Sequence, residues 1–489
     1  MSQYSGQRHS IEHEVRKRLV QNEAHSFSKG IDHADWYTLE RMDRFGMADH
    51  ATALAYHPVQ RLLAIGTANG QVVVLGKPGV KHYFDNVSLA PLHHLWFHPN
   101  SNRYLLVVDA RGELFVLDLH LRSMKYVYNL RTKVAALDCL PGNNWCMVAF
   151  EDGSVDFIDP VEGAHSELHI ECLLPVRKLH AARKRWGIYA QGINLERVIG
   201  AALNPANPDQ LLMGFTCNYV VLWSISQRKV LFQSDFEPSF LTPVHSPTDA
   251  APEGELEPPS DASPPRMTAI AWQPDGAQWV TVYTPNIVAF WGAREFKNHP
   301  LSVRPLVQPD AKRDGGLIGS PSSPKAINSE KELAYCSQLY WCTLPSNEPV
   351  ESAHESNAKV TSVYHTALVG LCGPTRDQQR FIHIERFTAE RGMQCPIQGT
   401  IYPMEGTVQD LQLLPTESPW CGSQLSPAGF AVLFTTGRLA LFDATVCFQA
   451  PSSDEEPLGP TRSLLAYDVP VDPSFLQPPV YEAFYWLQS

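Results

Sequence analysis

The sequence predicts an all-β fold built from a repeated unit of short strands, and two observations support this prediction. The first is the stretch 50–80, in which three short apolar runs are separated by turns. Asn69-Gly70 separates the second run from the third. An Asn-Gly pair in that position is a strong hairpin signal, because both residues tolerate positive φ. We therefore expect antiparallel strands at 52–56, 61–67 and 71–75.

The second observation is a regular period. Five turn prolines follow one another at spacings of 41, 42, 64 and 69 residues: Pro58, Pro99, Pro141, Pro205 and Pro274. Four-stranded units that repeat every 40–45 residues or so are typical of WD-type propeller blades. The sequence thus predicts a seven-bladed WD-type β-propeller over residues 36–444. The two long spacings are interpreted as single blades that carry insertions.

Each predicted blade has an apolar run that ends its third strand, at 72–75, 114–117, 155–158, 220–223 and 287–291. The hairpin glycines Gly70, Gly112 and Gly153 precede the first three of these runs. Two of the runs end in Trp, but none ends in Trp-Asp, so the repeats are degenerate. Less regular runs at 333–344, 361–372 and 381–387 are assigned to the sixth blade. Those at 407–414, 429–435 and 438–442 are assigned to the seventh.

Several of these segments resemble the lethal giant larvae/tomosyn family. Residues 53–67, Gly70 and 76–80, with the preceding Phe45-Gly46, are similar to the first blade of that family. Segments similar to its fourth and fifth blades lie at 211–215 with 220–223, and at 268–272 with Asp275-Gly276. The resemblance covers about 42–444, is strongest in the first blade and is weakest after Gly292. It corresponds to the N-terminal propeller of a family whose members carry two consecutive propellers.

The resemblance implies a non-enzymatic regulator of exocytosis and polarised vesicle transport. Its implied partners are plasma-membrane SNAREs of the syntaxin or SNAP-25 type, with a Rab GTPase or myosin as further candidates and a GTPase-regulating or effector role. The implied location is the cytoplasm, with peripheral association at the plasma membrane. Two alternatives stay open: a WD-repeat scaffold in another complex, such as a ubiquitin ligase or vesicle coat, and a propeller hydrolase.

Composition limits the remaining possibilities. The chain has 489 residues, 44% of them hydrophobic and 18% charged, which is typical of a folded protein with a large core. Its net charge of −12 disfavours nucleic acid as a partner. The ten cysteines include no Cys-x-x-Cys pair, so we expect reduced thiols and no zinc site. The sequence contains no run that approaches the ~20 apolar residues needed to cross a bilayer, so we expect no membrane-spanning helix.

Outside the blades, three kinds of segment are expected. The N-terminal part, 1–35, contains a short predicted helix at 10–24, with an apolar stripe and a basic cluster. Two Pro- and Ser-rich stretches, 237–266 and 309–331, are predicted to be disordered insertions. The Pro-rich C-terminal part, 445–489, is interpreted as a link to a missing second propeller. Its residues 481–487 are alternatively expected to supply a strand that closes the ring.

The insertion at 165–197 carries the candidate partner-binding site. It holds the densest basic cluster in the chain: Arg177, Lys178, Arg183, Lys184, Arg185 and Trp186. One interpretation is a solvated helical insertion. The other is a docking patch for an acidic SNARE helix, a small GTPase or anionic lipid, because arginines beside an aromatic side chain are good interface anchors.

Catalysis finds little support in the sequence. Phosphate loops, nucleophile elbows and His-Glu-x-x-His motifs are absent, and no cofactor or metal is expected. Carboxylates near strand ends are expected to be solvated or to cap turns rather than to act as an acid–base pair. These are Asp109, Glu113, Asp118, Glu151, Asp152, Asp156 and Asp159. The histidines His93, His94 and His98 are expected to be structural.

Overall fold

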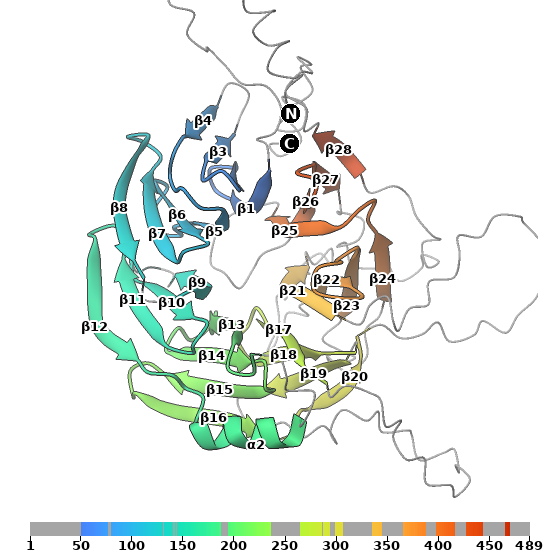
Figure 1. Cartoon of the computed structure of the whole chain (residues 1–489). Coiled ribbons are helices and arrows are strands. Elements are labelled where there is room, and N and C mark those ends of the chain that lie inside the picture. Colours follow the sequence, from blue (N-terminus) through green and yellow to red (C-terminus); the bar gives the residue numbers. More distant parts are fainter. Residues whose placement is uncertain are drawn as a thin grey trace, which may run out of the picture. The chain divides into compact units, whose positions relative to one another are not determined.

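Seven four-stranded antiparallel sheets form a ring in the computed structural model of the chain (Figure 1). The structure describes residues 50–76, 80–130, 132–139, 142, 144–186, 194–235, 265–285, 287–293, 299–306, 335–344, 365–387, 398–415, 427–443 and 465–469. All of them belong to the second of two compact units, which begins at Phe45. Each sheet uses four consecutive strands, so the predicted all-β, seven-bladed propeller is confirmed.

The first four blades and the single helix among the described residues come from the N-terminal half of the chain. Their elements are β1 (Ala51–His57), β2 (Leu62–Thr67), β3 (Val72–Leu75), β4 (Lys81–Phe84), β5 (Leu92–Phe97), β6 (Tyr104–Asp109), β7 (Glu113–Asp118), β8 (Ser123–Asn129), β9 (Val134–Cys139), β10 (Cys146–Phe150), β11 (Val155–Asp159), β12 (Ala164–Ile170), α2 (Val176–Trp186), β13 (Val198–Leu203), β14 (Gln210–Phe215), β15 (Tyr219–Ser224) and β16 (Lys229–Asp235).

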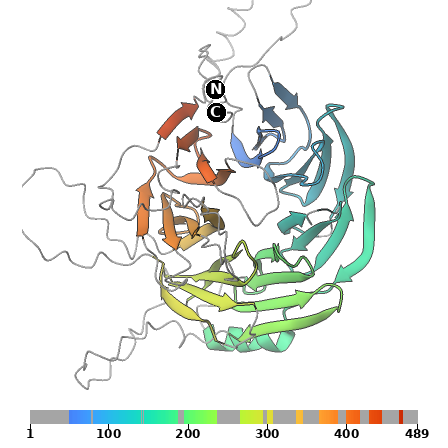
Figure 2. The same cartoon turned by 180° about the vertical axis from the view of Figure 1, so that it is seen from behind.

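The last three blades follow in the C-terminal half. Their strands are β17 (Met267–Trp272), β18 (Gln278–Tyr283), β19 (Ile287–Gly292), β20 (Ser302–Pro305), β21 (Tyr335–Leu344), β22 (His365–Gly373), β23 (Phe381–Phe387), β24 (Gln398–Pro403), β25 (Val408–Pro415), β26 (Pro427–Phe434), β27 (Leu439–Asp443) and β28 (Leu465–Val469). The first strand of each blade lies nearest the centre of the ring and the fourth lies at the rim, as both views show (Figures 1 and 2).

Packing between neighbouring blades explains why the second and third strands are apolar on both faces. The described core divides into seven clusters, and each lies between two adjacent sheets. Successive side chains of a strand point to opposite faces. In β2, Leu63 and Ile65 therefore pack against the seventh blade, whereas Ala64 between them packs against the second blade. The contact between the first and seventh blades closes the ring.

The tight hairpins depend on glycine where the sequence predicted it. Gly70, Gly112 and Gly153 have φ of +72°, +85° and +87°, a region that other residues adopt at a cost. The backbone of Gly70 also approaches the next connection closely, because its carbonyl accepts hydrogen bonds from Val87 N at 3.0 Å and Ser88 N at 3.2 Å.

Two boundaries differ from the sequence prediction. Residues 164–170 form β12, the outer strand of the third blade, so the insertion predicted to begin at residue 165 starts after this strand. The exposed side of β12 carries His165, Glu167 and His169, and this polar face hid the strand from an argument based on apolar runs. Likewise, β28 pairs with β27, so the propeller extends beyond residue 444 into the segment predicted to follow it.

Other predictions concern residues outside the described part of the chain. These are the helix at 10–24, the closing strand at 481–487, and the insertions at 237–266 and 309–331, of which only the end of the first is described. For the sixth and seventh blades the predicted strands agree with β21–β23 and β25–β27. The long proline spacings correspond to connections between blades, one of which contains α2.

Candidate partner-binding surface

The basic cluster forms part of α2, in the connection between the third and fourth blades. Its sequence has one β-branched residue and many good helix formers, which favours a helix. Lys178 N and Leu179 N both donate to the carbonyl of Pro175, at 2.8 and 3.2 Å, and so start the helix. In Figure 1 the helix lies in front of β16 and in Figure 2 behind it, so it lies on one face of the ring.

Two apolar side chains fix α2 to the propeller. Leu179 and Ala182, three residues apart and so on one side of the helix, pack into the cluster between the third and fourth blades. Leu173 and Leu174, just before the helix, belong to the same cluster. The helix is therefore held on the rigid ring by one face, and its orientation is set.

The opposite face of α2 is exposed and basic. Its exposed residues are Val176, Arg177, His180, Ala181, Arg183 and Lys184. The helix contains no acidic residue. Of the six residues predicted for partner binding, the structure thus places Arg177, Arg183 and Lys184 together on one surface, which we call the basic face. Lys178 is only half exposed, and the side chains of Arg185 and Trp186 lie outside the described part of the structure.

The charge of the basic face is only partly compensated. Arg183 Nη2 lies 2.6 Å from Glu196 Oε1, and both side chains are about half exposed, at 54% and 47%. An exposed pair of this kind contributes ~1 kcal/mol or less. Neither Arg177 nor Lys184 forms an ion pair with another described residue. The surface therefore keeps a positive potential within an acidic protein.

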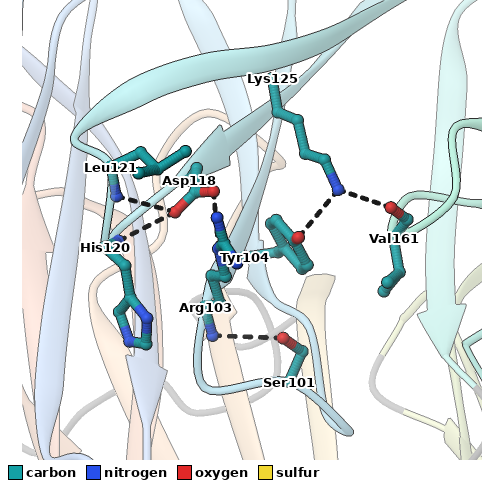
Figure 3. Close-up of polar contacts among 8 residues, drawn as sticks. All are labelled: Ser101, Arg103, Tyr104, Asp118, His120, Leu121, Lys125 and Val161. Atoms are coloured by element: carbon teal, nitrogen blue, oxygen red, sulfur yellow. Dashed lines mark hydrogen bonds and ion pairs between the residues drawn. The ribbon is translucent and has the colours of Figure 1, made fainter.

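The carboxylates singled out in the sequence analysis serve the fold. Asp118 Oδ1 accepts hydrogen bonds from His120 N at 3.0 Å and Leu121 N at 2.9 Å, and Asp118 Oδ2 lies 2.6 Å from Arg103 Nε (Figure 3). Asp109 accepts a 2.6 Å hydrogen bond from Ser88 Oγ. Both carboxylates stabilise turns, which agrees with the structural interpretation.

Figure 3 also shows how the second blade is joined to the third. Lys125 Nζ donates to Tyr104 Oη at 2.8 Å and to the Val161 carbonyl at 2.5 Å. The same ammonium group lies 4.4 Å from the centre of the Tyr104 ring. This lysine belongs to the outer strand β8 and therefore ties the rims of the two blades together.

The histidines at the second blade are also embedded in the fold. His94 stacks on Trp96 with ring centres 5.2 Å apart, and burial lowers the pKa of His94 to about 4. His98 Nε2 lies 3.2 Å from the carbonyl of Asn144, in the hairpin of the next blade. Within the part of the chain that the structure describes, no three His, Cys, Asp or Glu side chains could jointly hold a metal ion.

The sequence analysis missed a cavity of about 290 Å³ between the inner strands of blades two, three and four. Its walls are mainly apolar, and Asp138 and Cys139 also contribute to them: the lining is Trp96, Phe97, Pro99, Leu137, Asp138, Cys139, Leu203, Asn204, Pro205 and Pro208. Burial raises the pKa of Asp138 to about 6, although Leu203 N and Cys139 N donate to its carboxylate. No local pattern indicates this cavity, because three blades build it.

Comparison with known proteins supports the family resemblance noted in the sequence. No protein-family model matches the chain. Curated relatives include the lethal(2) giant larvae protein homolog SRO77 of Saccharomyces cerevisiae, 21% identical over 58% of this chain. They also include the human LLGL scribble cell polarity complex component 2, 23% identical over 60%, and the lethal(2) giant larvae protein of Drosophila melanogaster, 23% identical over 40%. The resemblance to the lethal giant larvae/tomosyn family is confirmed.

The match covers only part of the length of these lethal giant larvae relatives. The matched segment spans 26% of the yeast and human proteins and 17% of the Drosophila protein. A solved β-propeller domain, that of Cps50 (Swd1) from Myceliophteria thermophila, aligns with a TM-score of 0.45 at 14% identity, over 82% of this chain and 98% of that one. The fold assignment rests on the seven sheets themselves. No described helix is long and apolar enough to cross a membrane.

Proposed function

We propose that this chain is a non-enzymatic regulator of exocytosis and cell polarity that binds plasma-membrane SNAREs of the syntaxin or SNAP-25 type. The lethal giant larvae relatives support the class of function, since the name of the human relative makes it a cell polarity complex component. The basic face of α2 supports the mode of action. It is the single observation that carries the proposal, because it offers an exposed cationic surface in a protein of net charge −12.

The basic face is suited to an acidic helix. Leu179 and Ala182 hold α2 against the ring, so Arg177 and Lys184 project from a rigid support. A rigid support lowers the entropy lost on binding. Val176, which is 68% exposed, adds an apolar contact at the start of the same helix. Complementary charge increases the association rate and discriminates against wrong partners.

A binding function is also consistent with the carboxylates described above. Asp109 and Asp118 are occupied by turn hydrogen bonds, and this favours binding over hydrolysis as the role of the propeller. A Rab GTPase or myosin is a further proposed partner of the same surface, because the chemistry that the basic face recognises is an acidic protein surface.

The test is capture of the purified chain by immobilised syntaxin-type and SNAP-25-type SNAREs and by a Rab GTPase. The informative variant is Arg177→Glu/Arg183→Glu/Lys184→Glu. The matched control, Arg111→Glu/Arg122→Glu/Lys133→Glu, changes the net charge equally at exposed positions outside α2. Surface changes of this kind usually alter stability by about 0.5 kcal/mol or less each.

We expect the native chain and the control to capture a SNARE and the α2 variant to capture at least tenfold less. Equal capture by all three proteins would remove the basic face from the proposal. Failure of the native chain to bind any SNARE would reject SNARE regulation as its function, and selective binding to the Rab would reassign the partner.

A further inference from the structure

Cys139 and Cys146 face each other across two neighbouring strands of the third blade. They are paired residues in the antiparallel register of β9 and β10, and both thiols are free. The Cα atoms of directly opposite residues in such a pair lie about 4.5–5.5 Å apart. A disulfide accepts Cα separations of about 4.4–6.8 Å. The backbone therefore already has the spacing that a disulfide between them needs.

The thiol of Cys146 lies close to the imidazole of His98. Its Sγ lies 3.9 Å from the Asn144 carbonyl, and the Nε2 of His98 lies 3.2 Å from the same oxygen. The thiol and the imidazole thus converge on one atom. The other ring nitrogen of His98, Nδ1, is buried and has no hydrogen-bond partner among the described residues, so it is available to hold a proton.

Electrostatics favour the thiolate of Cys146. Burial alone would raise the pKa of the Cys146 thiol, but the proximity of Cys139 and of the His98 imidazole outweighs burial and lowers it. Burial likewise opposes protonation of His98, yet its contact with Cys146 raises the pKa of the imidazole. A low-pKa thiol beside an imidazole is the usual environment of a reactive cysteine.

The cavity lies against one member of the pair, Cys139. Cys139 is half-buried and lines the cavity of about 290 Å³, whereas Cys146, its partner on the neighbouring strand, is fully buried. The walls are apolar apart from Asp138, Cys139 and Asn204. The carboxyl of Asp138 would disfavour an anionic oxidant, so a small neutral one is favoured.

We propose that Cys146 and Cys139 form an oxidation site for hydrogen peroxide or a similarly small peroxide, which converts the pair into a disulfide. The Cys146 thiolate attacks one peroxide oxygen, the O–O bond breaks, and the other oxygen leaves as hydroxide, which takes up the proton that the thiol released and becomes water. The Cys139 thiol then attacks the sulfenic acid sulfur, and a second water leaves. One peroxide is reduced by two electrons and two thiols are oxidised. This proposal is independent of SNARE binding.

The sixth blade supplies a matched control. Cys336 and Cys372 are also directly opposite partners, in β21 and β22, and are 2% and 0% exposed. Hydrogen bonding to Cys336, burial and the charge of Glu385 raise the pKa of Cys372. Within the described chain neither thiol hydrogen-bonds to a histidine, and neither lines the cavity. Backbone geometry is thus common to both pairs, and the environment differs.

The experiment treats the full chain with hydrogen peroxide and blocks the remaining thiols after denaturation. Chymotrypsin cleaves after Trp145, between the two cysteines, so mass spectrometry detects a Cys139–Cys146 disulfide as two linked peptides. We expect this disulfide to form at least tenfold faster than a Cys336–Cys372 disulfide. Equal rates for the two pairs, or faster oxidation of the sixth-blade pair, would overturn the proposal.

Three variants separate the roles of Cys139, Cys146 and His98. In Cys139→Ser, oxidation should stop at a sulfenic acid on Cys146, which dimedone traps. In Cys146→Ser, peroxide should leave Cys139 reduced. His98→Gln, whose amide can still donate to the Asn144 carbonyl, should slow disulfide formation about tenfold. Oxidation of Cys139 at the native rate in Cys146→Ser would contradict the assignment of Cys146 as the nucleophile. The comparison with the sixth-blade pair is made in the native chain and needs no variant.

Discussion

The hairpin at Gly70 allows the repeat argument to be tested quantitatively. In Gly70→Ala the new Cβ would lie 1.9 Å from the carbonyl oxygen of Ser88, and this distance is impossible without a backbone shift. The positive φ of +72° adds a cost of ~1–2 kcal/mol for any residue with a Cβ. A shift of the Ser88 segment also weakens two hydrogen bonds to the Gly70 carbonyl, worth ~1 kcal/mol each. We therefore expect the free energy of unfolding of Gly70→Ala to be lower by about 3–4 kcal/mol.

Gly142→Ala is the control for this prediction. Its φ of +73° is nearly the same, but no atom of the described chain lies within 4 Å of the position that the alanine Cβ would take. Only the cost of the positive φ remains, so we expect the free energy of unfolding to fall by about 1–2 kcal/mol. Urea unfolding followed by tryptophan fluorescence would compare both variants with the native chain. Equal losses for the two substitutions would refute the close-approach argument for Gly70.

Two further predictions concern buried ionisable groups. Glu385→Gln should destabilise the protein by about 3–5 kcal/mol, because the buried guanidinium of Arg304, 2.6 Å away and 8% exposed, would lose the charge that compensates it. The double variant Arg304→Met/Glu385→Leu should lose less, and a larger loss would contradict the role of the uncompensated charge. For Asp138, the folded-state pKa of about 6 lies above the ordinary value of 3.8, so its contribution to stability is present below pH 4 and lost as pH rises through 6. Asp138→Asn should remove this part of the pH dependence, and an unchanged profile from about pH 4 to 7 would contradict it.

The sequence predicted the inner strands of the blades well because the signals for them lie within each short segment. β2 and β3 are apolar on both faces, and the turn between them needs a residue that tolerates positive φ, which Gly70 supplies. The rim strands were harder to predict. β12 and β28 lie at blade edges, and β12 exposes one face to solvent, so its polar alternation does not form an apolar run.

The candidate surface was predicted in part. The basic cluster is visible in sequence, and its position on a helix follows from its composition, but which residues share the exposed face depends on how Leu179 and Ala182 meet two blades. The proximity of His98 to the thiol pair could not be predicted. His98 belongs to the second blade and Cys146 to the third, and only the ring brings them together.

The most direct test of the central claim is the ionic-strength dependence of SNARE association by the native chain and by Arg177→Glu/Arg183→Glu/Lys184→Glu. Raising the salt concentration from about 0.1 to 1 M shortens the screening length from about 10 to about 3 Å. If the basic face of α2 attracts an acidic helix, the native association rate falls steeply with salt, and the two proteins converge at the higher concentration. A native rate that does not change with salt, or a variant that associates as fast as the native chain at the lower concentration, would contradict the account.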